Sequence, residues 1–134
     1  MTKILPLLFL GCAKDMPQAH AQGITRILTL CELRPASEVP LLHRPIPDEV
    51  WLPPDVWQGL VEDLHELVNT GHTVLVHCRL GVSRSPALVA AYLASYLGWT
   101  MEEAREMLTL ERPVVNIHPE MWRGVVEWYD GNMQ

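Results

Sequence analysis

Cys78 and Arg84 are the residues whose types and spacing most directly indicate chemistry. They stand six positions apart, between an apolar run at 74–76 and an apolar segment that begins at Pro86. Cysteine attacks as its thiolate, and because an ordinary thiol has a pKa of about 8.5, a site that uses one must stabilise the anion. A tight loop between a strand and a helix does so with backbone N–H groups at the positive end of the helix.

The residues between this cysteine and this arginine are also suited to hold a phosphate group. Inward-facing amides would bind the phosphate oxygens, and Gly81 can adopt a left-handed backbone at the crest of the loop. The guanidinium of Arg84 would bind two oxygens through two parallel N–H donors, a geometry that lysine lacks. We therefore interpret Cys78 as a nucleophile at the base of a phosphate-binding loop formed by Arg79, Leu80, Gly81, Val82, Ser83 and Arg84.

The stretch VHCRLGVSRS, residues 76–85, resembles the signature loop of the cysteine-dependent dual-specificity protein phosphatases. The resemblance covers nearly the whole chain, because the segments before and after this loop also resemble that family. It implies that Cys78 forms a phosphocysteine intermediate and that Arg84 binds phosphate and stabilises the transition state. It further implies that the Ser85 hydroxyl stabilises the departing thiolate, and that His77 and Asn116 support the loop.

The resemblance also implies a general acid, which in the family is an aspartate about thirty residues before the cysteine. Asp48 fits this place, 30 positions before Cys78 and within the proline-rich segment PIPDEVWLPP. Glu49 and Asp55 are the alternatives, because the reach of the carboxylate decides which residue protonates the leaving group. We expect Asp55 instead to cap the N-terminus of the helix that follows.

Cys31, in the segment ILTLCE, has two interpretations. It resembles the cysteine that follows the second strand in the lipid-phosphatase tumour suppressor and the regenerating-liver phosphatases, where it forms a reversible disulfide with the nucleophile. That resemblance implies that Cys31 is the redox partner of Cys78. Cys31 is equally well interpreted as a small buried hydrophobic residue, because the sequence does not give the distance that a disulfide requires.

Other functions remain as alternatives to a protein phosphatase. A rhodanese-like sulfurtransferase has a similar loop, but one residue shorter than the loop from Cys78 to Arg84. A non-catalytic phosphopeptide-binding module would lack the cysteine, the arginine or the acid, and this chain has all three. Phosphoinositide phosphatases carry lysines where this loop has Leu80 and Val82, and RNA 5′-phosphatases of similar size tend to be basic. We expect phosphotyrosine in proteins as the substrate, with phosphoserine and phosphothreonine included if the cleft is shallow.

Length and composition restrict the classes of molecule that this protein is expected to bind. The length of 134 residues predicts one domain over 1–134, and the net charge of −6 argues against nucleic acids and anionic membranes as partners. The expected partners are a phosphorylated protein or peptide, with phosphate or other oxyanions in the site. Three scattered cysteines do not form a disulfide framework, which predicts a reducing, cytoplasmic location. The remaining histidines lack metal-ligand spacing, and the mechanism requires neither a metal nor a cofactor.

The elements that must position these residues indicate an α/β fold. Strands are predicted over 4–10, 24–30 and 73–77, with a weaker one over 42–47, and Pro6 favours a sheet edge for the first. Pro6 and the short length also favour a strand there over a signal segment. Helices are predicted from 55 to about 70, from 86 to 97, from the capping box at 100–103 to Pro113, and from 118 onward. Together they predict a central mixed sheet of about four to five strands, flanked by helices.

Overall fold

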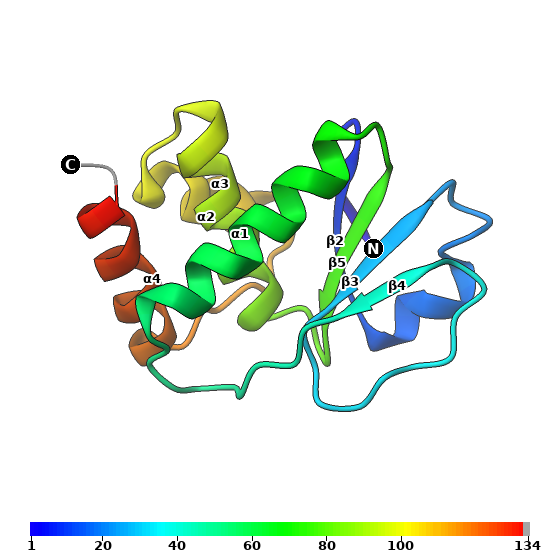
Figure 1. The fold of residues 1–134 in the computed structure, drawn as a ribbon, viewed down its shortest axis with the longest axis horizontal. Helices are drawn as coiled ribbons and strands as arrows, with labels where there is room; N and C mark the ends of the chain where they lie inside the picture. Colours follow the sequence, from blue (N-terminus) through cyan, green and yellow to red (C-terminus); the bar gives the residue numbers. More distant parts are fainter. Residues whose placement is uncertain (133–134) are drawn as a thin grey trace.

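The computed structural model describes residues 1–132 and confirms a mixed sheet flanked by helices (Figure 1). None of its helices is long and apolar enough to span a membrane. The strands are β1 (Thr2–Leu5), β2 (Leu8–Cys12), β3 (Arg26–Thr29), β4 (Leu41–His43) and β5 (Val74–Cys78). The helices are the 3-10 helix η1 (Ala13–Gln18) and the α-helices α1 (Pro54–Asn69), α2 (Arg84–Leu97), α3 (Met101–Glu111) and α4 (Pro119–Asn132).

The order of the strands brings distant parts of the chain to one edge of the sheet. The order is β1-β2-β5-β3-β4, in which β1 is antiparallel to β2 and the other neighbours are parallel. Every residue of the central strand β5 is buried, as its continuous apolar sequence predicts. Because β2, β3, β4 and β5 point the same way, the residues that follow them meet at the carboxyl edge, where α/β sheets bind ligands.

The prediction of one strand over 4–10 was wrong, because this segment forms an antiparallel hairpin of β1 and β2. The turn lies at Pro6 and Leu7. Proline has no N–H to donate to a strand ladder, so it ends β1, and β1 is indeed an edge strand. The weaker strand predicted over 42–47 is also shorter than expected, ending at His43, because the next residues include two prolines.

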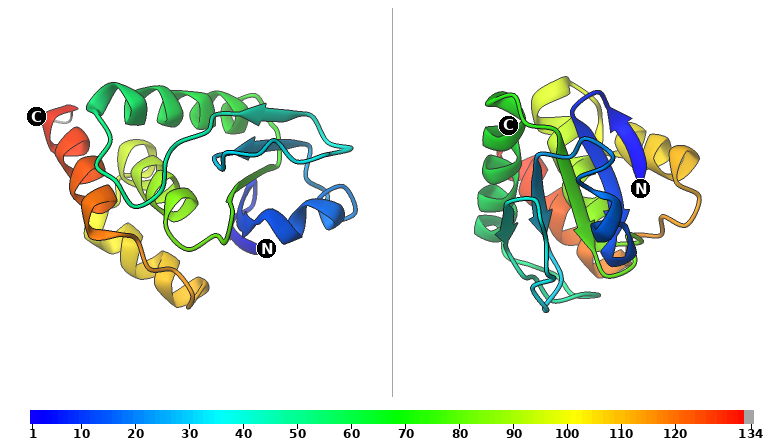
Figure 2. Two further views of the ribbon diagram at one scale, coloured as in Figure 1. Left: turned by 90° about the horizontal axis from the view of Figure 1, so that it is seen from below. Right: turned by 90° about the vertical axis from the view of Figure 1, so that its right-hand side faces the viewer.

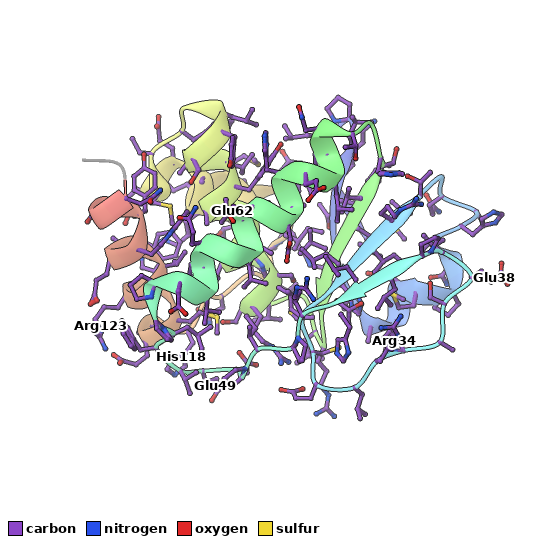
Figure 3. The ribbon with its side chains drawn as sticks, in the orientation of Figure 1. Arg34, Glu38, Glu49, Glu62, His118 and Arg123 are labelled. Atoms are coloured by element: carbon purple, nitrogen blue, oxygen red, sulfur yellow. The ribbon has the colours of Figure 1, made fainter. Side chains whose placement is uncertain are left out.

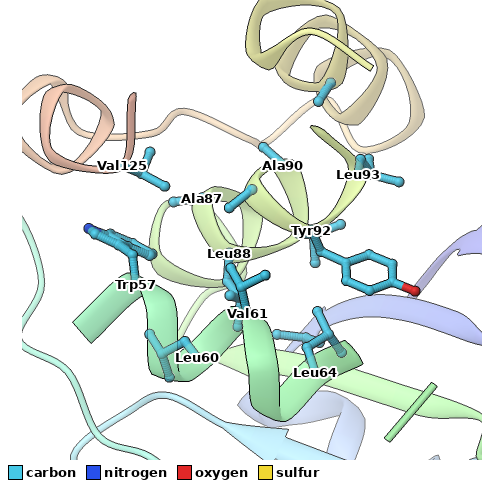
Figure 4. Close-up of a cluster of buried hydrophobic side chains, with 14 of the residues drawn as sticks. Trp57, Leu60, Val61, Leu64, Ala87, Leu88, Ala90, Tyr92, Leu93 and Val125 are labelled. Atoms are coloured by element: carbon cyan, nitrogen blue, oxygen red, sulfur yellow. The ribbon is translucent and has the colours of Figure 1, made fainter. Parts of the chain in front are cut away.

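The hydrophobic core lies on both faces of the sheet. On one face α1 and α2 pack together, with α4 beside them, as Figure 4 shows. On the other face η1 and the segment before β4 cover a smaller cluster, and in the right-hand view of Figure 2 η1 lies in front of the strands. The labelled core side chains are Trp57, Leu60, Val61 and Leu64 of α1, Ala87, Leu88, Ala90, Tyr92 and Leu93 of α2, and Val125 of α4.

Helix α2 is the most deeply buried helix; it begins at Arg84, two residues before the predicted start, and ends at Leu97 as predicted. Residues 84–94 of this helix are all buried, so α2 cannot shift relative to β5 without disturbing the core. Gly98 ends the helix in a left-handed conformation, with φ 77°. The predicted capping box then opens α3, with the Thr100 hydroxyl accepting from the Glu103 N–H at 3.0 Å. Because its first eleven residues are buried, the amino end of α2 is held close to the end of β5.

Candidate active site

The residues after the parallel strands surround one cavity of about 550 Å³ at the carboxyl edge of the sheet. Cys78, the last residue of β5, lies in this cavity and is 3% exposed. Leu80 is 65% exposed at the mouth, and the Arg79 side chain is also exposed. The lining consists of Glu32, Asp48, Glu49, Cys78, Arg79, Leu80, Val82, Ser83, Arg84, Asn116, His118 and Pro119.

The sulfur of Cys78 is surrounded by hydrogen-bond donors from the first turn of α2. Its Sγ lies 3.1 Å from Ser85 Oγ and 3.5 Å from the Ser85 backbone nitrogen, whose N–H donates to it. Ser85 is fully buried, so its hydroxyl is held close to the sulfur. A thiolate at this position accepts both bonds and faces the positive end of the α2 dipole.

The loop between β5 and α2 turns sharply at Gly81, which has φ 69° and so adopts the predicted left-handed conformation. A Cβ atom here would lie 2.6 Å from the Gly11 carbonyl oxygen and 2.6 Å from Arg112 Nη2. Both the backbone angle and the lack of space therefore require glycine.

The guanidinium of Arg84 is buried, and the described residues 1–132 meet only part of its hydrogen-bonding capacity. Its Nη1 donates to Glu32 Oε1 at 2.7 Å and to the Ile46 carbonyl oxygen at 3.1 Å. Its Nε is buried and has no hydrogen-bond partner among the described residues 1–132. An arginine whose Nη1 hydrogens are both engaged retains the Nε–Nη2 edge, which is the fork that binds two oxygens of one phosphate.

Glu32, which follows β3, was not predicted as a site residue. Its pKa is held below the ordinary value, first by its own backbone N–H and, in the same direction, by the Arg84 guanidinium. The carboxylate therefore stays ionised and keeps one side of the guanidinium occupied. A charged residue directly after a parallel strand was the available signal, because all such residues meet at this edge of the sheet.

Asp48 lies on the loop between β4 and α1, and its Oδ2 is 3.8 Å from Arg84 Nε. Its Oδ1 accepts the Glu49 backbone N–H at 2.9 Å. Glu49 lines the same cavity as His118, and Figure 3 labels both at this end of the molecule. Of the three predicted acids, Asp48 and Glu49 thus lie at the cavity.

Asp55 lies elsewhere, in a depression between α1 and α4 that Gln58 and Trp128 also line. The prediction that Asp55 caps α1 was wrong, because the N-cap residue is Pro53. The helix begins one residue earlier than expected, since Pro54 suits the first position of a helix. Asp55 instead stands in the first turn, where its negative charge favours the helix dipole.

His77 lies beneath the loop and joins two strands. Its Nδ1 is 3.1 Å from the Cys78 carbonyl oxygen and its Nε2 is 2.8 Å from Thr29 Oγ1. A carbonyl oxygen only accepts, so Nδ1 carries the proton and Nε2 accepts from the threonine hydroxyl. Burial lowers the pKa of His77, which keeps this neutral arrangement near pH 7.

Three hydrogen bonds join the loop to the segment that follows α3. Asn116 donates its backbone N–H to the Val82 carbonyl oxygen at 2.8 Å. Arg112 donates from Nε to the Gly81 carbonyl oxygen at 3.1 Å, and Ser83 Oγ accepts the His118 N–H at 3.0 Å. Arg112 and Ser83 were not predicted to make these contacts, because each contact joins residues more than thirty positions apart and leaves no local pattern.

Cys31 is buried just after β3, and its Sγ donates to the Leu33 carbonyl oxygen at 3.5 Å. Its pKa is raised, first by burial, with the Cys78 sulfur acting in the same direction. Both cysteines are free thiols in this structure.

Comparison with known proteins identifies the family. Residues 8–131 match the model of the dual specificity phosphatase catalytic domain. This chain belongs to the dual-specificity phosphatase family. It is 32% identical over 148 residues to mouse dual specificity protein phosphatase 15, an alignment that covers 100% of this chain and 60% of the mouse protein. This member of the family thus spans about 60% of the length of that relative.

Solved structures of the dual-specificity phosphatase family share the same fold. DUSP15 superimposes with a TM-score of 0.85 at 28% identity, covering 100% of this chain and 90% of that one. Human DUSP28 gives a TM-score of 0.88 at 24% identity, covering 99% and 98% of the two chains. The predicted dual-specificity phosphatase fold is confirmed.

Replacement of Gly81 by alanine is expected to destabilise the protein more than the same change at Gly71. Both have positive φ, but nothing lies within 4 Å of a Cβ at Gly71. Gly71→Ala should lower the free energy of unfolding by about 1–2 kcal/mol through backbone strain, and Gly81→Ala by about 1–3 kcal/mol more through the clash. Urea unfolding of both variants measures the difference, and equal losses would show that the loop tolerates a Cβ.

Proposed function

We propose that this chain is one catalytic domain of a protein phosphatase that hydrolyses phosphotyrosine monoesters, and phosphoserine and phosphothreonine where these reach the thiol. The observation that carries the proposal is the Nε of Arg84, which has no hydrogen-bond partner within residues 1–132 and is buried in the wall of the open cavity that holds Cys78. A buried polar group without a partner is costly, and a phosphate dianion supplies the missing acceptors.

In the first step the substrate phosphate occupies the loop, held by its amides and by the free edge of Arg84. The Cys78 thiolate attacks phosphorus, a sulfur–phosphorus bond forms and the bond from phosphorus to the leaving oxygen breaks. Asp48 gives its proton to that oxygen, so the product leaves as a neutral alcohol or phenol. The position of Asp48 3.8 Å from Arg84 supports this role, because the arginine marks where the phosphate lies.

In the second step water attacks the phosphocysteine. Asp48, now ionised, takes a proton from the water, and the sulfur–phosphorus bond breaks to release inorganic phosphate and the thiolate. The Ser85 hydroxyl, 3.1 Å from the sulfur, donates to the thiolate as it leaves. Neither step, as proposed, requires a metal or a cofactor.

Other substrates of this chemistry are less well supported. The exposed carboxylates of Glu32 and Glu49 line the cavity, and the loop has Leu80 and Val82 where a polyanion would need cations. These groups disfavour phosphoinositides and RNA 5′-phosphates relative to a single phosphorylated side chain. With a net charge of −6, we expect no nucleic-acid or anionic-membrane partner, and a cytoplasmic phosphoprotein as substrate.

Cys78→Ser should abolish turnover of para-nitrophenyl phosphate while vanadate binding persists, because the hydroxyl is a poor nucleophile but the loop is intact. Wild-type activity should survive a chelator. Cys12→Ser is the matched control, since Cys12 is a free cysteine that lies beside Cys78 in the register of β2 and β5. Retained turnover in Cys78→Ser would refute the nucleophile assignment, and wild-type sulfur transfer from thiosulfate without phosphatase activity would favour the rhodanese-like alternative.

Asp48→Asn should slow the hydrolysis of phenyl phosphate by about 10²–10⁴-fold, the usual contribution of a general acid. An activated ester such as 2,4-dinitrophenyl phosphate should lose far less, because its leaving group departs without a proton. Steady-state kcat/KM for both esters measures the effect, because it reports only the steps up to departure of the leaving group, with Glu49→Gln and Asp55→Asn as controls. If Glu49→Gln or Asp55→Asn shows this selective loss instead, the acid is that residue and not Asp48.

Cys31→Ser should prevent the recovery of phosphatase activity after oxidation by hydrogen peroxide. Peroxide oxidises the Cys78 thiolate to the sulfenic acid and is reduced to water, and the Cys31 thiol then condenses with it, forming a disulfide and releasing a second water. Dithiothreitol should restore wild-type activity, but Cys31→Ser should be overoxidised irreversibly. Undiminished recovery in Cys31→Ser, or its loss in Cys12→Ser instead, would exclude Cys31 as the redox partner.

A further inference from the structure

The loop that carries Asp48, residues 46–52, is anchored in the core at both ends. Ile46 donates its N–H to the Leu30 carbonyl oxygen at 3.0 Å and is 5% exposed, and Leu52 is 6% exposed. Among the contacts of residues 1–132, the Asp48 side chain itself is held only by the Glu49 N–H and by its ion pair with Arg84 at 3.8 Å. The position of the Asp48 carboxylate at the cavity therefore depends on where the two anchoring residues, Ile46 and Leu52, lie.

The second anchor is reinforced by a contact between Trp51 and helix α4. The Trp51 indole N–H donates to Glu127 Oε2 at 3.2 Å, a bond between residues 76 positions apart. The Arg123 guanidinium lies 6.0 Å from the centre of the Trp51 ring and is paired with Glu127 at 2.9 Å. Figure 3 labels Arg123 and Glu49 at the same end of the molecule. A large aromatic side chain is thus docked on the outside of α4.

Gly124 makes this close docking possible. A Cβ atom here would lie 3.0 Å from Trp51 Cδ1 and 3.3 Å from both the backbone nitrogen and oxygen of Leu52. Glycine within a helix costs about 1 kcal/mol relative to alanine, so the helix is weakened at the point where the loop meets it. The loop backbone reaches its position because α4 carries no side chain there.

The same helix also contacts the phosphate-binding loop. Ser83 Oγ accepts the His118 N–H just before α4 and donates to Met121 Sδ at 3.8 Å within it. We propose that α4 is the common support of both loops, and that Trp51 and Gly124 are positioning residues that set the place of Asp48 relative to Cys78. This inference rests on the proposed function, because it assigns a role to the distance between acid and nucleophile.

A displaced Asp48 impairs both steps, but only the first step, in which it protonates the leaving oxygen, depends on which ester is hydrolysed. Proton transfer to the leaving group weakens steeply with distance, and a displacement of about 1 Å can cost about 10²-fold in rate. Attack by Cys78 and phosphate binding by Arg84 do not involve Trp51, so they should continue. Loss of the contact is therefore distinguished from general damage by its dependence on the leaving group.

The test compares kcat/KM, which reports the steps up to release of the leaving group, for phenyl phosphate and 2,4-dinitrophenyl phosphate in wild type, Trp51→Ala, Trp51→Phe and Gly124→Ala, each as the whole 134-residue chain. In Trp51→Ala and Gly124→Ala we expect kcat/KM for the phenyl ester to fall about 10–100-fold, and kcat/KM for the activated ester to fall only a few-fold. Trp51→Phe keeps a ring against α4 and should retain most activity. Trp122→Ala is the matched control, because Trp122 is a half-buried tryptophan of the same helix that packs under Arg105 at 4.4 Å instead.

The double variant Trp51→Ala/Gly124→Ala adds a second criterion. The added methyl group at position 124 no longer meets the indole ring, because that ring is absent in this variant. The loss on phenyl phosphate should therefore be smaller than the product of the two single losses. Equal losses on both esters, or the same selective loss in Trp122→Ala, would overturn the positioning role. A wild type that hydrolyses neither ester would instead refute the proposed function, whereas an active wild type with unaltered variants would refute this inference alone.

Discussion

The burial of the Arg84 guanidinium is the constraint on which the rest of the site depends. A buried cation is costly unless it is paired and hydrogen-bonded, and the Arg84 side chain is 4% exposed. Glu32 after β3 and the Ile46 carbonyl oxygen after β4 meet part of this need. They leave one edge of the guanidinium for the cavity that holds Cys78. The two segments that satisfy the arginine are thereby brought to Cys78, and the proposed phosphate would meet the requirement that they leave unmet.

The helices hold the residues around Arg84 in fixed positions. Helix α2 is buried along most of its length, so its amino end and the Ser85 hydroxyl cannot move away from the sulfur. His77 joins β3 to β5 beneath the loop, and Arg112 holds the loop from the side of α3. Helix α4 contacts the phosphate-binding loop through Ser83 and the acid loop through Trp51. Cys78 ends β5 and Arg84 and Ser85 begin α2, so the positions of these side chains depend on how the strand and the helix pack.

Local patterns in the sequence predicted most elements, and the failures have local causes. The capping box at Thr100, the glycine at 98 and the buried strand β5 depend on neighbours within a few residues, so they were visible in advance. Pro6 was interpreted as a residue of an edge strand, but it forms the turn that divides two strands. Asp55 is a good capping residue, yet Pro54 starts α1 one position earlier. In both cases the backbone restriction of proline outweighed an apolar or capping preference.

The sequence by itself determined the loop that begins at Cys78, because Cys78, Gly81, Arg84 and Ser85 lie within one strand–loop–helix unit whose geometry is local. The tertiary structure alone decided which distant groups complete it. Glu32 and Asp48 reach Arg84 because parallel strands end at a common edge, and Trp51 reaches Gly124 because α4 packs beside α1 and α2. Contacts between residues far apart in the chain depend on how whole elements pack, and no short stretch of sequence records that packing.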